Sequence, residues 1–75
     1  MTLGERVKEI RAAQRITQER LAYKADVSRV TIARLEKGSQ ENTTWQNVAK
    51  LDRAFGLTVV ELLKGVDIDI ESAVA

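Results

Sequence analysis

Residues 28–37 carry the side chains of this sequence whose types and spacing are best suited to binding chemistry. Arg29 and Arg34 present guanidinium groups, which can donate two parallel hydrogen bonds to O6 and N7 of guanine in a major groove. Val30 can contact a thymine methyl group. The same face contains Ser28, Ala33 and Lys37, and no acid. Two interpretations are open, a surface that reads DNA bases and an ordinary solvated basic helix face.

The segment around this face has the spacing of two short helices joined by a tight turn. Thr17 is a suitable N-cap for the first helix and Ser28 for the second. Asp26 tolerates a left-handed backbone better than most residues, which favours a turn there, and Gly38 ends the second helix. The inward positions are apolar: Leu21, Ala22, Ala25, Val27, Ile32 and Leu35. This spacing predicts a helix-turn-helix. With that motif present, we favour DNA readout over simple solvation as the role of the basic face of residues 28–37.

Helical periodicity continues on both sides of this motif. Thr2 and Glu5 form a capping box that begins a helix over residues 3–14, and Thr44 caps a later helix that ends at Gly56. The inward side chains expected in these two helices are Leu3, Val7, Ile10, Trp45, Val48, Leu51 and Phe55, with Ala13 as a less regular member.

A second capping box, Thr58 with Glu61, begins a short last helix that is expected to run to Gly65. The sequence therefore predicts an all-α fold of five helices. Residues 1–65 form one helix-turn-helix domain, and residues 66–75 form a C-terminal tail.

The stretch TQERLAYKADVSRVTIARLEKG (residues 17–38) resembles the helix-turn-helix of the Xre/Cro family of phage and bacterial repressors. LDRAFGLTVVELL (residues 51–63) resembles the closing helices of the same lambda-repressor-like domain. The resemblance covers roughly residues 3 to 64. The size of the chain and its LAYKA segment are similar to the small controller proteins of restriction–modification systems.

The resemblance implies one structural ion pair, Arg11 with Glu36. If the two meet partly buried, they lock the second helix of the motif against the scaffold; the alternative is two unrelated surface charges. Two positions depart from the family pattern. Arg15 stands where Gly often ends the first helix, which leaves that end undefined, and Asp52 replaces a small apolar residue, so it is either exposed or paired with a neighbouring Arg.

The resemblance and the residue chemistry together assign roles in DNA binding. The expected base contacts are Ser28, Arg29, Val30 and Arg34. The expected phosphate contacts are Thr17 and Gln18 at a helix start, Lys37, and the loop residues Ser39, Gln40 and Asn42. The loop has a second interpretation, a plain solvated connection.

Composition excludes several functional classes. The chain has no Cys and no His, which removes zinc sites of those ligands, thiol nucleophiles and imidazole catalysis. We expect no enzyme activity, no metal, no cofactor and no small-molecule ligand. No apolar run approaches a membrane span and no signal peptide is evident, so we expect a cytoplasmic protein that does not bind membranes.

Charge is unevenly distributed along the chain. Residues 1–40 contain nine basic and five acidic residues, a net charge of +4, whereas residues 41–75 contain three basic and six acidic residues, a net charge of −3. An anionic partner such as double-stranded DNA would therefore meet the first half. The total of +1 argues against a nonspecific DNA coat protein.

The last helix is more apolar than one small core can bury. Its residues Leu57, Val59, Val60 and Leu63 are either a two-fold dimer interface or core filling. The tail VDIDIESAVA alternates apolar and acidic residues, which predicts either a strand pairing between subunits or a frayed acidic end.

We expect a sequence-specific transcriptional regulator that binds a palindromic operator as a homodimer. It would act either as a repressor that blocks a promoter or by contacting polymerase beside it. The alternative is a helix-turn-helix subunit specialised for protein interaction, as in an antitoxin.

Overall fold

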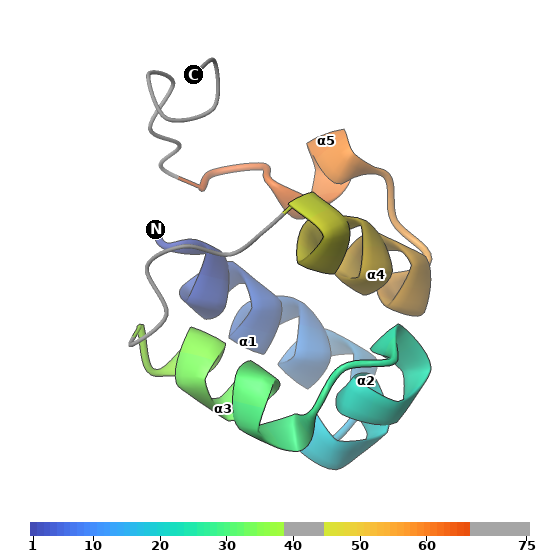
Figure 1. Ribbon diagram of the computed structural model, residues 1–75. Helices are drawn as coiled ribbons and strands as arrows, with labels where there is room; N and C mark the ends of the chain where they lie inside the picture. The colour runs from blue at the N-terminus through green and yellow to red at the C-terminus, as the bar shows by residue number, and fades with distance from the viewer. Residues whose placement is uncertain (39–44, 67–75) are drawn as a thin grey trace.

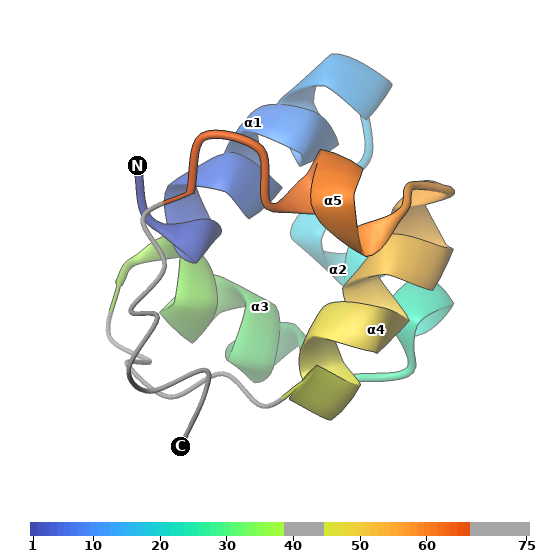
Figure 2. The same ribbon diagram turned by 90° about the horizontal axis from the view of Figure 1, so that it is seen from above.

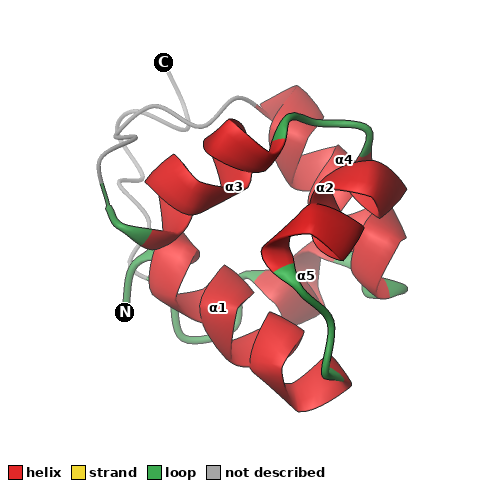
Figure 3. Cartoon of the chain, turned by 90° about the horizontal axis from the view of Figure 1, so that it is seen from below, coloured by secondary structure: helices red, strands yellow, loops and turns green. Residues whose placement is uncertain are grey.

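The computed structural model describes residues 1–38 and 45–66, and in this part of the chain every regular element is a helix (Figures 1 and 3). The five helices are α1 (Leu3–Gln14), α2 (Gln18–Ala25), α3 (Arg29–Glu36), α4 (Trp45–Phe55) and α5 (Val59–Leu62). The all-α, five-helix prediction is confirmed. The last helix is shorter than expected, because it ends at Leu62 instead of running to Gly65.

The helix starts follow the cap chemistry of the sequence. The Thr2 hydroxyl accepts from the Glu5 N–H at 3.1 Å, and the Glu5 carboxylate accepts from the Thr2 N–H at 3.0 Å. Thr58 and Glu61 form the same reciprocal pair at the start of α5. Single caps begin α2 and α3, from Thr17 and Ser28. Each cap satisfies backbone donors that a helix start leaves free.

Two helix ends use a left-handed residue that is not glycine. Arg15, with φ 56°, ends α1, and Asp26, with φ 57°, ends α2. After α1, the N–H of Arg15 donates to Ala12 O and that of Ile16 to Arg11 O, both at 3.1 Å. The backbone therefore closes the last turn of α1 although Arg15 carries the steric cost of a left-handed conformation.

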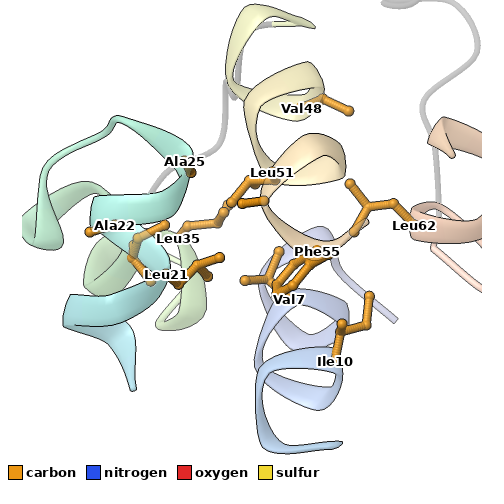
Figure 4. Close-up of a cluster of buried hydrophobic side chains, with 12 residues drawn as sticks. Val7, Ile10, Leu21, Ala22, Ala25, Leu35, Val48, Leu51, Phe55 and Leu62 are labelled. Atoms are coloured by element: carbon orange, nitrogen blue, oxygen red, sulfur yellow. The ribbon is translucent and has the colours of Figure 1, made fainter. Parts of the chain in front are cut away.

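One core unites the five helices, and each helix supplies one side chain that is less than 2% exposed. These side chains are Val7, Leu21, Ile32, Leu51 and Leu62. α2 packs against both α3 and α4, α1 against α3, and α5 against α4. Figure 4 shows Phe55 of α4 beside Val7 of α1, and Leu62 reaching from α5 toward α4. The core therefore fixes α3 relative to the other helices.

The crossing of α1 and α3 depends on a glycine. A Cβ atom at Gly4 would lie 1.8 Å from the carbonyl oxygen of Leu35. Any side chain there would force the two helix backbones apart, so Gly4 sets how closely the C-terminal half of α3 approaches the scaffold.

Two apolar side chains differ from the sequence prediction. Trp45 is 57% exposed and Ala13 is also exposed, although both were expected to face inward. Trp45 is the first residue of α4 and Ala13 is next to the last residue of α1, so the packed neighbours that cover the middle of each helix do not cover them. Periodicity gives the direction of an apolar face but not how far its neighbours extend.

Asp52 was expected to be either exposed or paired with a neighbouring Arg, and both expectations are wrong. The residue is only 7% exposed, and its Oδ1 atom has no hydrogen-bonding partner among residues 1–38 and 45–66. Burial raises the pKa of this carboxyl group above its usual value. Asp52 is therefore a destabilising feature of the core, since an ionised carboxylate is costly to bury unpaired.

Some expected features lie outside the described residues. These are the Thr44 cap, the loop residues Ser39, Gln40 and Asn42, and residues 67–75 of the tail with their two proposed conformations.

Candidate nucleic-acid interface

The outward face of α3 is built from a stripe at helical spacing. Val30, Ala33, Arg34 and Lys37 are three, four and seven residues apart, which places them on one side of the helix. The opposite side holds Ile32 and Leu35, which are 1% and 4% exposed and anchor α3 in the core. Core packing therefore determines which side chains α3 presents to solvent.

The cations of this face are available for an external partner. Arg29, Arg34 and Lys37 are exposed, and across residues 1–38 and 45–66 their charged groups have no ion pair or hydrogen bond. Val30, at 55% exposure, lies among them as an apolar surface. The face thus combines free guanidinium groups with a small hydrophobic contact, the combination that recognises base edges.

The one acidic residue of α3 is turned away from this face. Glu36 accepts from Arg11 Nε at 2.8 Å and from Arg11 Nη2 at 3.0 Å, while Gln18 Nε2 donates to the same carboxylate at 3.2 Å. The Glu36 side chain is 4% exposed and that of Arg11 is 20% exposed. The structure thus brings together the two residues of the expected ion pair, with bidentate geometry.

Electrostatics at Glu36 follow from this arrangement. Burial alone would raise the pKa of the Glu36 carboxyl group, but the hydrogen bonds from Arg11 and Gln18 and the charges of Arg11 and Lys8 outweigh it, so the pKa lies below its usual value. The same hydrogen bond raises the pKa of Arg11. Glu36 therefore stays ionised and neutralised, and it does not repel an anion bound at the face of α3.

Ser28 is occupied within the protein. Its hydroxyl accepts from the Thr31 N–H at 3.1 Å and lies 2.8 Å from the Thr31 hydroxyl. Ser28 therefore acts first as the N-cap of α3. Sequence reasoning missed Thr31 as its partner, although a Ser followed three residues later by a second hydroxyl residue was visible in the sequence.

The start of α2 lies against the same carboxylate. Thr17 accepts from the Arg20 N–H at 3.0 Å and so caps α2. A side-chain amide has two N–H donors. Gln18 uses one for Glu36 and keeps the second for another acceptor. In addition, Arg11 Nη1 donates to Ile16 O at 3.0 Å, which fixes the turn just before α2.

The residues expected at a dimer interface divide into two groups. Leu57 and Leu63 are partly buried and pack against the core, whereas Val59 is 43% exposed and Val60 is 81% exposed. Val60 and the buried Leu62 are two positions apart, about 200° around a helix, so they face opposite ways. We call Val59 and Val60 the α5 apolar surface.

Two polar side chains of α1 have structural roles that sequence reasoning missed. Arg6 donates to the carbonyl oxygens of Glu61 and Leu62, and Gln14 donates to that of Phe55 at 3.0 Å. These contacts join positions more than 40 residues apart, and no local signal marks them in the sequence.

Comparison with known proteins agrees with this geometry. Residues 2–64 match a protein family described as a helix-turn-helix domain. The chain is similar to control protein C.BamHI of Bacillus amyloliquefaciens, with 31% identity over 64 residues, which is 84% of this chain and 78% of that protein. Its fold is similar to that in a solved complex of the SinR and SinI proteins, with a TM-score of 0.77 and 26% identity over 97% of this chain and 75% of that one.

None of the described helices has the length and apolar character needed to cross a membrane. The matched family consists of DNA-binding regulators and not of enzymes. This chain belongs to the helix-turn-helix domain family, as an Xre-type protein with a lambda-repressor-like fold.

Proposed function

We propose that this protein is a sequence-specific transcriptional regulator that inserts α3 into the major groove of DNA. The observation that carries the proposal is the outward face of α3. Arg29, Arg34 and Lys37 are exposed there and have no ion pair with any described residue, while Arg11 holds Glu36 on the inward side. Arg29 and Arg34 read base edges, with guanine as the preferred partner, and Val30 contacts a thymine methyl group. Ser28 lies at the end of α3 that enters the groove first and reaches a base or a phosphate.

The phosphate contacts flank this helix. Thr17 and Gln18 lie at the start of α2, where free backbone N–H groups favour an anion, and the second amide hydrogen of Gln18 is available for a phosphate oxygen. Lys37, at the other end of α3, is a further proposed phosphate contact, as are Ser39, Gln40 and Asn42, which follow it in the sequence. These contacts set the position of the protein on the duplex, whereas the arginines supply sequence preference.

One copy reads too little DNA for a selective regulator. An α3 of eight residues is about 12 Å long and covers about four base pairs. Two copies related by a two-fold axis, with their α3 helices about 34 Å apart, would read a palindromic operator. We propose the α5 apolar surface, flanked by Leu57 and Leu63, as the contact between copies, since Val60 is otherwise an 81% exposed valine. Regulation follows from occupancy, either by blocking a promoter, as a repressor does, or by contacting polymerase beside it.

Selection of bound sites from random duplexes, followed by mobility-shift titrations, tests this function. Arg29→Ala and Arg34→Ala should each weaken operator binding by about 5- to 150-fold, or about 1–3 kcal/mol, and each should relax preference at one base position. Gln18→Ala should weaken all sequences alike. Arg53→Ala is the matched control, because Arg53 is an exposed cation on α4. Equal losses on operator and random DNA for all three interface variants would contradict the roles assigned here.

A second candidate function is protein interaction. The exposed Val60 favours it, and the similar solved structure is a complex of two different proteins, SinR and SinI. In this case the α5 apolar surface would bind a different chain, as in an antitoxin. Light scattering separates the candidates: a purified protein that stays monomeric and does not shift any duplex at low salt would favour this second function.

A further inference from the structure

α5 is too short to be stable by itself. It has four residues, and isolated helices of that length do not form in water. Leu62, which is fully buried, anchors one side of it, and the Thr58–Glu61 capping box satisfies its N-terminal end. Its last carbonyl groups also need partners, because a helix end leaves them unsatisfied.

Arg6 of α1 supplies side-chain donors to the last two of these carbonyl groups. Its Nε donates to Leu62 O at 3.0 Å and its Nη2 donates to Glu61 O at 2.9 Å. A third donor, Nη1, pairs with the Glu9 carboxylate at 2.6 Å, one turn further along α1. The Arg6 side chain is 19% exposed. Figure 2 shows α5 and the segment after it beside α1. A cation at the C-terminal end of a helix also complements the helix dipole.

These contacts act directly on the α5 apolar surface. The two carbonyl groups that Arg6 binds belong to the two residues that follow Val60 in the chain. Without Arg6, these two carbonyl groups would lose their side-chain donors, and Val59 and Val60 would be held less firmly. The single turn would then depend on core packing, on the Thr58–Glu61 box and on backbone bonds such as Lys64 N–H to Glu61 O at 3.4 Å. Ordering a mobile surface at an interface lowers affinity.

We infer that Arg6 is a positioning residue for self-association: it orients α5 from α1 so that Val59 and Val60 meet their counterparts in a second copy. This inference rests on the homodimer proposed above. Arg6 itself touches neither DNA nor the second copy in this assignment. Its effect should therefore appear in dimer formation and not in the affinity of one α3 helix for its half-site.

The experiment compares Arg6→Gln and Arg6→Lys with two controls. Gln14→Ala removes another hydrogen bond from α1, to the last carbonyl of α4, and Arg53→Gln removes an exposed arginine. Sedimentation equilibrium gives the dimer dissociation constant. Mobility shifts on duplexes with one and with two half-sites of the selected operator give the DNA affinities, and thermal melts report folding.

Arg6→Gln should weaken self-association by about tenfold, the effect expected for loss of charged hydrogen bonds. Binding to two half-sites should weaken in step, with single half-site affinity within about twofold of wild type. The single ammonium group of Arg6→Lys cannot donate to both carbonyl groups in the geometry of the guanidinium. Its dimer dissociation constant should therefore lie between those of wild type and Arg6→Gln. Both controls should associate as wild type does.

Unchanged self-association of Arg6→Gln would overturn the inference. So would a parallel loss on one and two half-sites, because ordinary destabilisation lowers both; Arg6→Lys makes the same comparison if Arg6→Gln does not fold. A wild-type protein that is monomeric at all concentrations, and binds two half-sites no more tightly than one, would instead reject the homodimer itself. The two failures are therefore distinguishable.

Discussion

The Arg11–Glu36 pair should be strongly coupled in stability measurements. Glu36 receives two hydrogen bonds from Arg11 and one from Gln18, and its side chain is 4% exposed. Arg11→Met leaves a buried carboxylate with one neutral donor. An unpaired buried charge costs about 3–5 kcal/mol. Since the Arg11 side chain is 20% exposed, water can enter, and the loss should be about 3 kcal/mol.

The reverse change should cost less. Glu36→Met leaves Arg11 with Ile16 O as a partner and with partial access to water, so we expect a loss of about 2 kcal/mol. The double variant removes both charges and replaces them with apolar side chains, so it should cost about 2 kcal/mol. The resulting coupling energy is about 3 kcal/mol. A 75-residue domain has a total stability near the lower end of 5–15 kcal/mol, so either single change should be conspicuous.

Urea unfolding of the four proteins measures this coupling from the midpoints at constant m value. Lys8→Met with Glu36→Met is the matched control cycle, because Lys8 lowers the pKa of Glu36 by its charge, with no hydrogen bond to it between the described residues. That cycle should give less than about 0.5 kcal/mol. An Arg11–Glu36 coupling as small as that of the control would refute the reasoning.

The pH dependence of the same pair has a definite sign. The pKa of Glu36 is lowered in the folded protein, so its ionised form stabilises the fold above the unfolded pKa, and that contribution disappears as pH falls through the lower folded value. Wild type should therefore lose more stability than Glu36→Met on acidification below the usual carboxyl range. Both proteins contain Asp52, so its opposite contribution cancels. Parallel stability curves at acid pH would contradict this assignment.

Three other substitutions test the scaffold. Gly4→Ala should lower the free energy of unfolding by about 3 kcal/mol, because its Cβ would lie 1.8 Å from Leu35 O; a urea midpoint equal to wild type would contradict this close approach. Asp52→Ala should stabilise the protein by about 1 kcal/mol at neutral pH, or about 4–8 °C in Tm, since it removes a buried unpaired carboxylate. Because the pKa of Asp52 is raised in the fold, this gain should shrink as acid protonates the wild-type carboxyl group, and calorimetry at two pH values checks the trend. Arg15→Gly should raise stability by about 0.5–1 kcal/mol by relieving the left-handed φ of 56°, and a lower urea midpoint would show that no strain is stored there.

Local chemistry explains which elements could be predicted from the sequence. Thr2, Thr17, Ser28 and Thr58 all cap helices, because each needs only a backbone N–H three residues away. The inward positions of α2 and α3 also follow from spacing, since both helices are packed along their whole length. Arg11 and Glu36 could be paired only by resemblance, because no periodicity connects positions 25 residues apart.

The parts that could not be predicted depend on tertiary neighbours. Asp52 is buried although it is charged, and a pattern of polar and apolar residues assigns such a side chain to the surface. Arg6 is one of nine basic residues in positions 1–40, and nothing in the sequence separates it from the others. Its role depends on its contact with α5, which the fold creates. Arg15 ends α1 because its own N–H and that of Ile16 close the last turn. A glycine at this position would have predicted the left-handed conformation, whereas an arginine does not.

The position of Glu36 links the two kinds of DNA contact proposed here. Its partners are Arg11 on α1 and Gln18 at the start of α2, and Arg11 also binds Ile16 O in the turn before α2. One carboxylate on α3 therefore binds both Arg11 of the scaffold and Gln18, the residue proposed to bind phosphate. Since these bonds lie within the protein, they fix the spacing between the proposed phosphate contact and the side chains of α3 proposed to read bases. On the proposed function, we expect sequence preference to depend on which base edges Arg29 and Arg34 meet at that fixed spacing, and not on adjustment of the motif to each duplex.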